Sequence, residues 1–182
     1  RDAEAPSIAC LGSQILDTTP GECTGVLPDY RGLTAVNDNC PATVVITQMP
    51  PAGTVVNAGS SETITLVARD EAGNTVSCSF VVSVQDNEPP VISPGAGATE
   101  AVVQNGPFAA IPPATAEDNC DGFIMVTPTC IAGDCTFDTS VLGNTWTIEY
   151  LAMDSAGNVG SATTVFTVSN DVTPPFINGP SN

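Results

Sequence analysis

The sequence contains no lysine and no histidine, and three arginines face 20 acidic residues, so the formal net charge is −17. Without histidine there can be no Ser–His–Asp or Cys–His catalytic pair and no His-ligated zinc. Without lysine there can be no Schiff base and no P-loop phosphate site. Three scattered arginines cannot neutralise rows of phosphates, so nucleic acid and anionic membrane surfaces are excluded as partners. These absences predict a protein that is not an enzyme.

Charged residues are also scarce, at 13 %, whereas hydrophobic residues make up 42 % of the chain. No apolar run approaches the roughly 20 residues of a membrane-spanning helix, and no long window has helical periodicity. Polar positions are filled mainly by Thr, Ser and Asn, with Gly and Pro between short β-branched runs. This pattern is typical of an all-β protein.

A repeat organises the chain. Three segments begin alike: Asp2-Ala-Glu-Ala-Pro6-Ser-Ile8, Asp86-Asn-Glu-Pro-Pro90-Val-Ile92 and Asp171-Val-Thr-Pro-Pro175-Phe-Ile177. Two further motifs keep nearly the same offset: Asp38-Asn-Cys40 with Asp118-Asn-Cys120, and Asp70-Glu-Ala-Gly-Asn74 with Asp154-Ser-Ala-Gly-Asn158. A shared period of about 84 residues predicts tandem domains at 1–85 and 86–170, with 171–182 as the start of a third repeat or a linker. We therefore expect the chain to be part of a longer array.

Each repeat predicts a similar set of strands. Residues 63–69 and 145–153 alternate in polarity, and each run is followed by the Asp-x-Ala-Gly-Asn turn and a second strand. Glycine supplies a positive φ in that turn while Asp and Asn bond the local backbone, so the pattern predicts a hairpin. About seven short strands in some 85 residues favour a Greek-key immunoglobulin-like β-sandwich. The single tryptophan, Trp146, falls at a predicted core position.

These motifs also resemble a known family, the hyalin repeat or HYR domain. The resemblance rests on Cys10, Asp38-Asn-Cys40, the apolar strand before Asp70-x-Ala-Gly-Asn74, and Cys78-Ser-Phe-Val-Val. The second repeat keeps Asp118-Asn-Cys120 and Asp154-x-Ala-Gly-Asn158 but has Pro94 near the position of the first cysteine and Ala162 at that of the last. The resemblance implies an extracellular, immunoglobulin-like adhesion module of the kind found in tandem on bacterial surface proteins, without catalytic residues.

The chain has seven cysteines, which are not spaced as paired C-x-x-C zinc ligands. Their number indicates disulfides formed in an oxidising, extracytoplasmic compartment. In a Greek-key sandwich of this type the first and last strands run side by side, so we predict a Cys10–Cys78 bridge. By elimination, Cys23 would pair with Cys40.

In the second repeat, Cys130 and Cys135 flank a hairpin-like loop, so we predict a local bridge between them. Cys120 would then be left as a free thiol, with an interchain bond or a Cys120–Cys130 bridge as alternatives. No nucleophilic role is expected for this thiol because the chain has no base to activate it.

The same topology predicts that acidic residues gather at one end of each domain. The candidate calcium ligands are Asp2, Glu4, Asp38, Asp70 and Asn74 in the first repeat, and Asp86, Glu88, Asp118, Asp154 and Asn158 in the second. Clustered carboxylates without neighbouring cations repel one another, and Ca²⁺ relieves this by taking six to eight oxygen ligands from loops. As an alternative, Asp38 and Asp70 only cap their own turns, and the acids between the repeats are only solvated.

Together these features predict a non-catalytic repeat module on the outside of a cell, in an adhesin, stalk or filament. Its expected role is spacing and adhesion, with stiffness from disulfides and from calcium at the domain junctions. The expected partners are neighbouring repeats of the same array. Alternatives are a carbohydrate- or protein-binding module and a self-assembling filament subunit whose edge strands pair with another copy.

Overall fold

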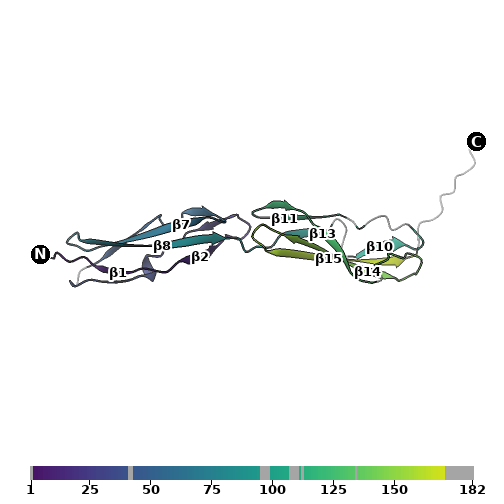
Figure 1. The fold of residues 1–182 in the computed structure, drawn as a ribbon, viewed down its shortest axis with the longest axis horizontal. Helices are drawn as coiled ribbons and strands as arrows, with labels where there is room; N and C mark the ends of the chain where they lie inside the picture. Colours follow the sequence, from purple (N-terminus) through teal and green to yellow (C-terminus); the bar gives the residue numbers. More distant parts are fainter. Residues whose placement is uncertain are drawn as a thin grey trace, which may run out of the picture. The chain divides into compact units, whose positions relative to one another are not determined.

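The computed structural model describes residues 2–40, 43–94, 99–106, 111, 113–133 and 135–170. The chain divides into two compact units, unit 1 at Arg1–Glu88 and unit 2 at Pro89–Asn182. Both units are built from β-strands (Figure 1). The expected repeat start at 171–182 lies outside the described residues.

Unit 1 is organised around a four-stranded sheet. Its strands are β2 (Gln14–Asp17), β8 (Thr75–Gln85), β7 (Ser61–Arg69) and β5 (Val45–Met49), in the order β2-β8-β7-β5. β2 runs parallel to β8 and the other pairs are antiparallel. The sequence of β7 and β8 alternates strictly, so even-numbered residues such as Ile64, Leu66 and Val82 are fully buried while odd-numbered ones face outward. This alternation determines which face of the sheet packs on the core.

Two short strand pairs complete unit 1: β1 (Ser7–Ala9) with β4 (Ala35–Asn37), and β3 (Thr24–Val26) with β6 (Val55–Asn57). The buried core consists of Leu27, Tyr30, Val56, Ile64, Leu66, Phe80, Val82 and Val84. Tyr30 meets Phe80 edge to face, with ring centroids 5.1 Å apart. Apolar side chains from strands distant in sequence therefore share one core.

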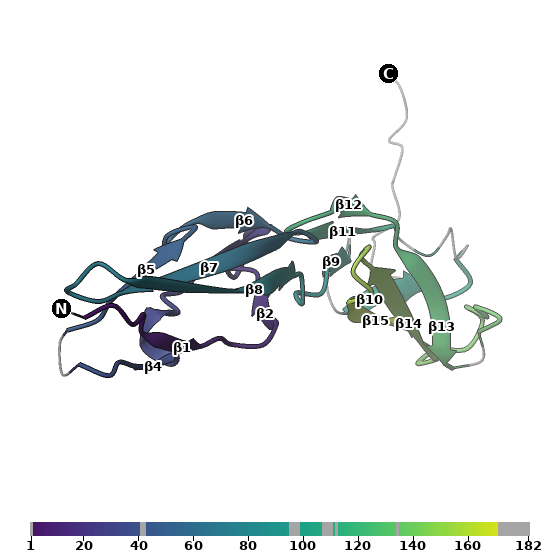
Figure 2. The ribbon, with the colours of Figure 1, turned by 60° about the vertical axis from the view of Figure 1, so that its left-hand side comes forward.

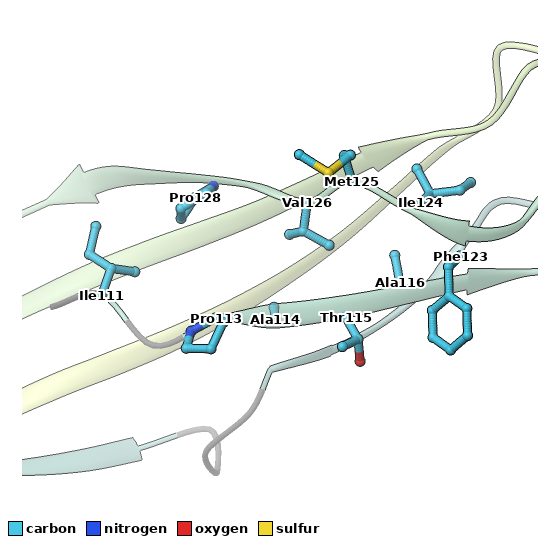
Figure 3. A pocket seen from close by; sticks show the side chains of 10 residues that line it. All are labelled: Ile111, Pro113, Ala114, Thr115, Ala116, Phe123, Ile124, Met125, Val126 and Pro128. Atoms are coloured by element: carbon cyan, nitrogen blue, oxygen red, sulfur yellow. The ribbon is translucent and has the colours of Figure 1, made fainter.

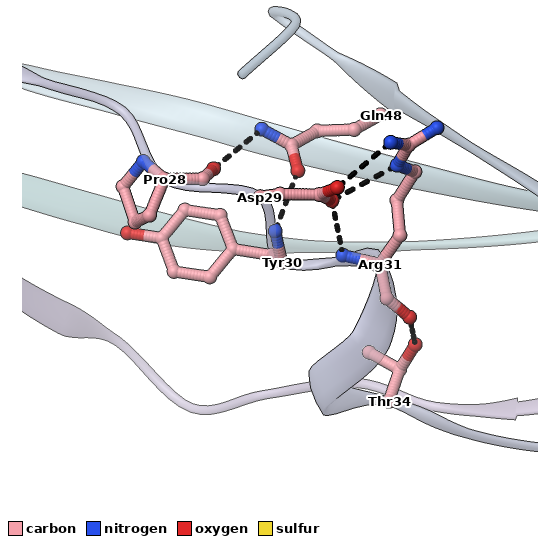
Figure 4. A network of polar contacts seen from close by, with 6 residues as sticks. All are labelled: Pro28, Asp29, Tyr30, Arg31, Thr34 and Gln48. Atoms are coloured by element: carbon pink, nitrogen blue, oxygen red, sulfur yellow. Dashed lines mark hydrogen bonds and ion pairs between the residues drawn. The ribbon is translucent and has the colours of Figure 1, made fainter. Parts of the chain in front are cut away.

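The loop between β3 and β4 contains a short 3₁₀ turn, η1 (Arg31–Leu33), and is attached to β5 by a polar network (Figure 4). Gln48, which is 9 % exposed, accepts a hydrogen bond from the Tyr30 backbone N–H at 2.8 Å and donates one to the carbonyl of Pro28 at 3.1 Å. Asp29 binds the Arg31 guanidinium through both carboxylate oxygens, which lowers the pKa of Asp29 to about 2. The bonds with Tyr30 and Pro28 satisfy the buried amide of Gln48 and hold the loop against the sheet.

Unit 2 contains a four-stranded and a three-stranded sheet (Figure 2). The first has the order β10 (Thr99–Val103), β15 (Val159–Ser169), β14 (Thr145–Met153) and β13 (Thr127–Ala132). The second has the order β12 (Gly122–Ile124), β11 (Ala114–Asp118) and β9 (Val91–Pro94). The buried core consists of Trp146, Ile148, Tyr150, Phe166 and Val168. Phe137 packs on Trp146, with 5.6 Å between the ring centroids. The predicted core position of Trp146 is confirmed.

The long hairpin recurs with the period seen in the sequence. β7 and β14 have nine residues each, β8 and β15 have eleven, and corresponding residues are 84 positions apart. The connecting turns place Gly73 at φ +96° and Gly157 at φ +94°, which side-chain-bearing residues rarely adopt. The predicted all-β, immunoglobulin-like sandwich architecture is confirmed. Across the described ranges, no helix offers the apolar length that a membrane crossing requires.

Candidate functional site

Unit 1 brings together three of its polar side chains at one end. Single ligand atoms of Asp2, Asp38 and Cys40 all lie within 4.8 Å of one another. Asp38 directly follows β4, so the β1–β4 pairing positions it near the start of the chain. Its Oδ1 accepts the Cys40 backbone N–H at 2.8 Å, whereas its Oδ2 is buried and has no hydrogen-bond partner. An unpaired buried carboxylate oxygen is costly, so this atom is the most unusual feature of the group.

Glu4 extends this group toward the surface. Its backbone N–H donates to Asp2 Oδ1 at 3.1 Å, and its Oε2 accepts from Asn39 Nδ2 at 2.9 Å. Asp2, Glu4, Asn39 and Cys40, with Ala3, line a shallow open recess. The Glu4 backbone N–H, and then the Cys40 thiol, lower the pKa of Asp2. The first three acids of the predicted set are therefore close together.

The charge of the group is also visible at the thiol of Cys40. The hydrogen bond with Asp2 raises the pKa of Cys40 most, followed by burial and by the negative charges of Asp2, Asp38 and Asp70. The described neighbourhood is thus strongly negative. Such a field favours cations and disfavours a thiolate.

Asp70 and Asp154 are placed differently, because each is saturated by its own turn. Asn74 donates to both carboxylate oxygens of Asp70, and Asn158 donates to both oxygens of Asp154. Both acids are 5 % exposed. Burial would raise the pKa of Asp154, but hydrogen bonds from the side chain and backbone of Asn158 outweigh burial and lower it. Asp70 therefore caps its turn, as the alternative interpretation expects, and Asp154 does the same in unit 2.

The acids near the end of unit 1 form another local arrangement. Asp86 Oδ1 accepts the backbone N–H of Glu88 at 3.1 Å. Both carboxylate oxygens of Glu88 accept the backbone N–H of Gly21, at 3.0 and 3.1 Å. Glu88 is therefore attached to the loop between β2 and β3, 67 residues away in the sequence.

Unit 2 repeats the Asp38 arrangement at Asp118. Its Oδ1 accepts the backbone N–H groups of Cys120 at 2.8 Å and Asp121 at 3.0 Å, while its Oδ2 is buried without a hydrogen-bond partner. Asp121 in turn accepts the Ser155 Oγ at 2.9 Å and the Ser155 backbone N–H, which joins this loop to the turn at Asp154. Asp121 is not among the predicted ligands. Its signal is the extra acid after Asp-Asn-Cys, where the first repeat has Pro41.

Two predicted disulfides are confirmed. Cys10 is bonded to Cys78, with 5.7 Å between their Cα atoms, and Cys130 is bonded to Cys135, with 5.9 Å between theirs. The first bridge joins the segment after β1 to β8, as side-by-side first and last strands require. The second closes a short loop, and it excludes the alternative Cys120–Cys130 bridge.

The predicted Cys23–Cys40 bridge is wrong, because Cys40 is a free thiol and Cys23 is disulfide-bonded. The Cys23 carbonyl accepts a hydrogen bond from the backbone N–H of Ala58, which lies near the start of β7. Cys40 lies close enough to Asp70, just after the end of β7, for the charge of Asp70 to raise the pKa of its thiol. A nine-residue strand is roughly 30 Å long, and bridged Cα atoms lie at most about 7 Å apart. The two cysteines therefore lie at opposite ends of unit 1.

The prediction of a free Cys120 is also wrong, since Cys120 is disulfide-bonded. That prediction rests on pairing the other two cysteines of the second repeat, Cys130 and Cys135, with each other, which leaves no partner for Cys120 within the repeat. The structure places the odd thiol at Cys40 instead, beside Asp2 and Asp38.

Comparison with known proteins gives a match that covers unit 1. Residues 1–84 match the HYR domain. The whole chain aligns at 29 % identity over 188 residues with hyalin from Strongylocentrotus purpuratus, and it spans 15 % of that protein's length. The expected HYR domain is thus supported for unit 1.

Solved structures of protocadherin, cadherin and titin domains also align with the chain. Human protocadherin-24 EC1-2 aligns over 93 % of this chain and 100 % of its own, with 14 % identity and a TM-score of 0.38. Drosophila N-cadherin EC1-4 aligns over 92 % of this chain and 50 % of its own, with 10 % identity and a TM-score of 0.41. Titin I67–I69 aligns over 91 % of this chain and 66 % of its own, with 16 % identity and a TM-score of 0.37. Scores this low carry no argument about function.

Proposed function

We propose that this chain is a non-catalytic, extracellular repeat segment of a cell-surface adhesin, stalk or filament. The match of residues 1–84 to the HYR domain carries the proposal. The two assigned disulfides support an oxidising compartment, and the lack of histidine and lysine argues against most covalent and acid–base catalysis. The proposed partners are the neighbouring repeats of the same array. Unit 2 is proposed to be a second domain of the same type.

We further propose that the acidic ends of the units bind Ca²⁺. The buried Oδ2 atoms of Asp38 and Asp118 fit this ion, because each lacks a hydrogen-bond donor and a hard cation would satisfy it. In unit 1, Asp2 and Glu4 would supply further carboxylate oxygens, with water completing the coordination. The bound ion would neutralise part of the negative charge that Asp2, Glu4 and Asp38 bring together.

The remaining predicted ligands have weaker claims. Asn74 and Asn158 already occupy the carboxylates of Asp70 and Asp154, so these four residues would shape the loops around an ion rather than hold it. Glu88 is bonded to Gly21, and Asp86 is bonded to the Glu88 backbone. Because both carboxylate oxygens of Glu88 accept the Gly21 N–H, calcium binding at Glu88 would require these hydrogen bonds to be exchanged.

Thermal unfolding in Ca²⁺, in Mg²⁺ and in EDTA tests the calcium proposal. A site filled at a hundred times its Kd adds nearly 3 kcal/mol to the free energy of unfolding, so Ca²⁺ should raise the Tm by several degrees. Asp38→Asn should reduce this shift, whereas Glu62→Gln, an equal charge change on β7, should keep it. A Ca²⁺ shift below about 2 °C, or an equal loss in both variants, would contradict calcium binding at Asp38.

Adhesion needs a separate readout. Binding of the folded chain to a glycan array and to candidate surface proteins would distinguish an adhesive module from a spacer. A chain that binds neither, in Ca²⁺ or in EDTA, would leave only the spacing role. Because the melting experiment does not involve a partner, calcium binding and adhesion can fail independently.

A further inference from the structure

On three of the four strands of the main sheet in unit 1, β5, β7 and β8, the outward side carries no acidic residue. This hydroxyl face consists of the odd-numbered residues of three adjacent strands: Val45, Thr47 and Met49 of β5; Ser61, Thr63, Thr65, Val67 and Arg69 of β7; and Thr75, Ser77, Ser79, Val81, Ser83 and Gln85 of β8. Arg69, at the end of β7, is its single charged residue. In a chain with 20 acids and a net charge of −17, a face of three strands without a carboxylate is unusual.

The hydroxyl face is accessible and internally ordered. Met49 is 67 % exposed and Val45 is 58 % exposed. Hydroxyl groups pair across the strands, with 3.0 Å between the oxygens of Thr65 and Ser79 and 2.9 Å between those of Ser61 and Ser83. The nearest acid on the same sheet is Asp17 of β2, which accepts a hydrogen bond from Gln85 at the corner of the face. Most side chains of the face are thus short and uncharged, and four of its hydroxyl groups are held in pairs.

Unit 2 carries a different residue at the centre of the corresponding face. Its β14 matches β7 with an offset of 84 residues, so Glu149 stands where β7 has Thr65. Glu149 lies opposite Thr163 in β15, as Thr65 lies opposite Ser79 in β8. This position of the fold therefore accommodates a glutamate, and only unit 1 lacks a carboxylate there.

We propose that the hydroxyl face binds the same face of a second copy of this chain. Two copies repel each other wherever carboxylates meet, so the acid-free face is the surface where the repulsion is smallest. A hydroxyl both donates and accepts hydrogen bonds, so a hydroxyl surface is complementary to itself, as a two-fold symmetric interface requires. A carboxylate surface has acceptors only and cannot pair in this way.

The size of the face determines the strength of this contact. β5, β7 and β8 have five, nine and eleven residues, so they are roughly 17, 30 and 37 Å long. At a spacing of about 4.8 Å they cover roughly 400 Å² per copy, or roughly 800 Å² in total. That area is below the roughly 1,200 Å² of stable interfaces and is suited to a weak, reversible dimer. Because the remaining surface of each copy is negative, added salt should strengthen the dimer by screening the repulsion.

Sedimentation equilibrium of the whole chain tests this proposal, at concentrations up to about 1 mM and in EDTA so that no divalent ion can bridge copies. We expect a monomer–dimer equilibrium whose Kd falls several-fold between about 50 and 500 mM NaCl. Thr65→Glu should raise the Kd at least about tenfold, and Ser77→Glu should do the same as an independent change on β8. Circular dichroism verifies that each variant is folded.

Ala35→Glu is the matched control, because Ala35 is exposed on β4, outside the main sheet. It adds the same charge and should leave the Kd within about twofold of the unmodified chain. A chain that stays monomeric at every concentration and salt level would overturn the proposal. So would equal weakening by Ala35→Glu and Thr65→Glu. The calcium proposal is unaffected by either result, because these measurements are made without the ion.

Discussion

Asn74 donates hydrogen bonds to both carboxylate oxygens of Asp70, from its backbone N–H to Oδ1 and from Nδ2 to Oδ2, each at 2.8 Å. Asn158 and Asp154 repeat this arrangement at 2.7 and 2.8 Å. Each pair closes the turn of the long hairpin in its unit. A buried carboxylate is thereby stabilised without a basic residue, in a chain that has very few.

Removal of the Asn74 side chain should destabilise unit 1. Asn74→Ala leaves Oδ2 of the 5 % exposed Asp70 without its donor, so we expect a loss of about 1–3 kcal/mol in the free energy of unfolding. Urea denaturation followed by circular dichroism measures this loss. Glu71→Ala, at an exposed position of the same turn, should change stability by less than about 0.5 kcal/mol. Equal effects of the two changes would mean that the Asn74–Asp70 pair is not stabilising.

The stability of unit 2 should depend on the ionisation of Asp154. Burial alone would raise the pKa of Asp154, but the hydrogen bonds from Asn158 hold it below 3.8, the value of a free aspartate. The pKa of Asp154 is lower in the folded chain than in the unfolded chain, so its ionised carboxylate stabilises the fold above about pH 4. This stabilisation is lost as the pH falls through the pKa of the folded chain.

Urea titrations from about pH 7 to pH 2 would measure this contribution. The unmodified chain should exceed Asp154→Asn in stability most clearly above pH 4, and the gap should narrow in more acidic solution. Ser161→Ala removes no carboxyl group and should keep the slope of the unmodified chain. A gap that is constant across this range would show that the charge of Asp154 does not stabilise the turn.

The disulfides should differ in their effect on stability. The chain-entropy relation gives roughly 4 kcal/mol for the Cys10–Cys78 bridge, with a separation of 68, and about 2 kcal/mol for Cys130–Cys135, with a separation of 5. Replacing each pair by serine and measuring urea denaturation tests this order. Cys40→Ser should cost about 1 kcal/mol or less, and the unmodified chain, unfolded without reductant, should titrate as one thiol.

Gly160 should tolerate no side chain. A Cβ at this position of β15 would overlap the backbone carbonyl oxygen of Pro90, just before β9. Gly160→Ala must therefore push these backbone segments apart, and we expect unfolding to be easier by about 2 kcal/mol or more. Gly12→Ala is the control, because its Cβ would meet no atom within 4 Å. Chemical denaturation measures both variants, with Trp146 fluorescence as the probe for Gly160→Ala and circular dichroism as the probe for Gly12→Ala. An unchanged stability of Gly160→Ala would contradict the prediction.

Local sequence patterns were sufficient to predict the main hairpins. Inward and outward side chains alternate along β7 and β8, and a turn with Gly73 at positive φ joins the two strands. This combination leaves few other conformations available to these residues. The short β3 and β6 strands were missed, because three residues of each carry no periodic pattern. Their pairing depends on tertiary contacts, including the burial of Leu27 and Val56.

Long-range contacts limited the prediction of the candidate site. The gathering of Asp2, Glu4 and Asp38 followed from the order of strands in a sandwich, but the bond from Gly21 to Glu88 spans 67 residues and leaves no mark in the sequence. Pairing Cys23 with Cys40 by elimination failed for the same reason, since elimination takes no account of position along a strand. The turn-capping roles of Asp70 and Asp154 could be anticipated, because the Asn partner is only four residues away.

The Cys10–Cys78 bridge also determines how unit 1 would respond to a pulling force. If tension were applied to its two ends, it would pass through the bridge from Cys10 to Cys78, and residues 11–77 would not be stretched between these two cysteines. At about 3.5 Å per extended residue, roughly 230 Å of chain would be withheld from stretching. The bridge thus makes unit 1 nearly inextensible, and chemical reduction would convert it into a long, compliant tether.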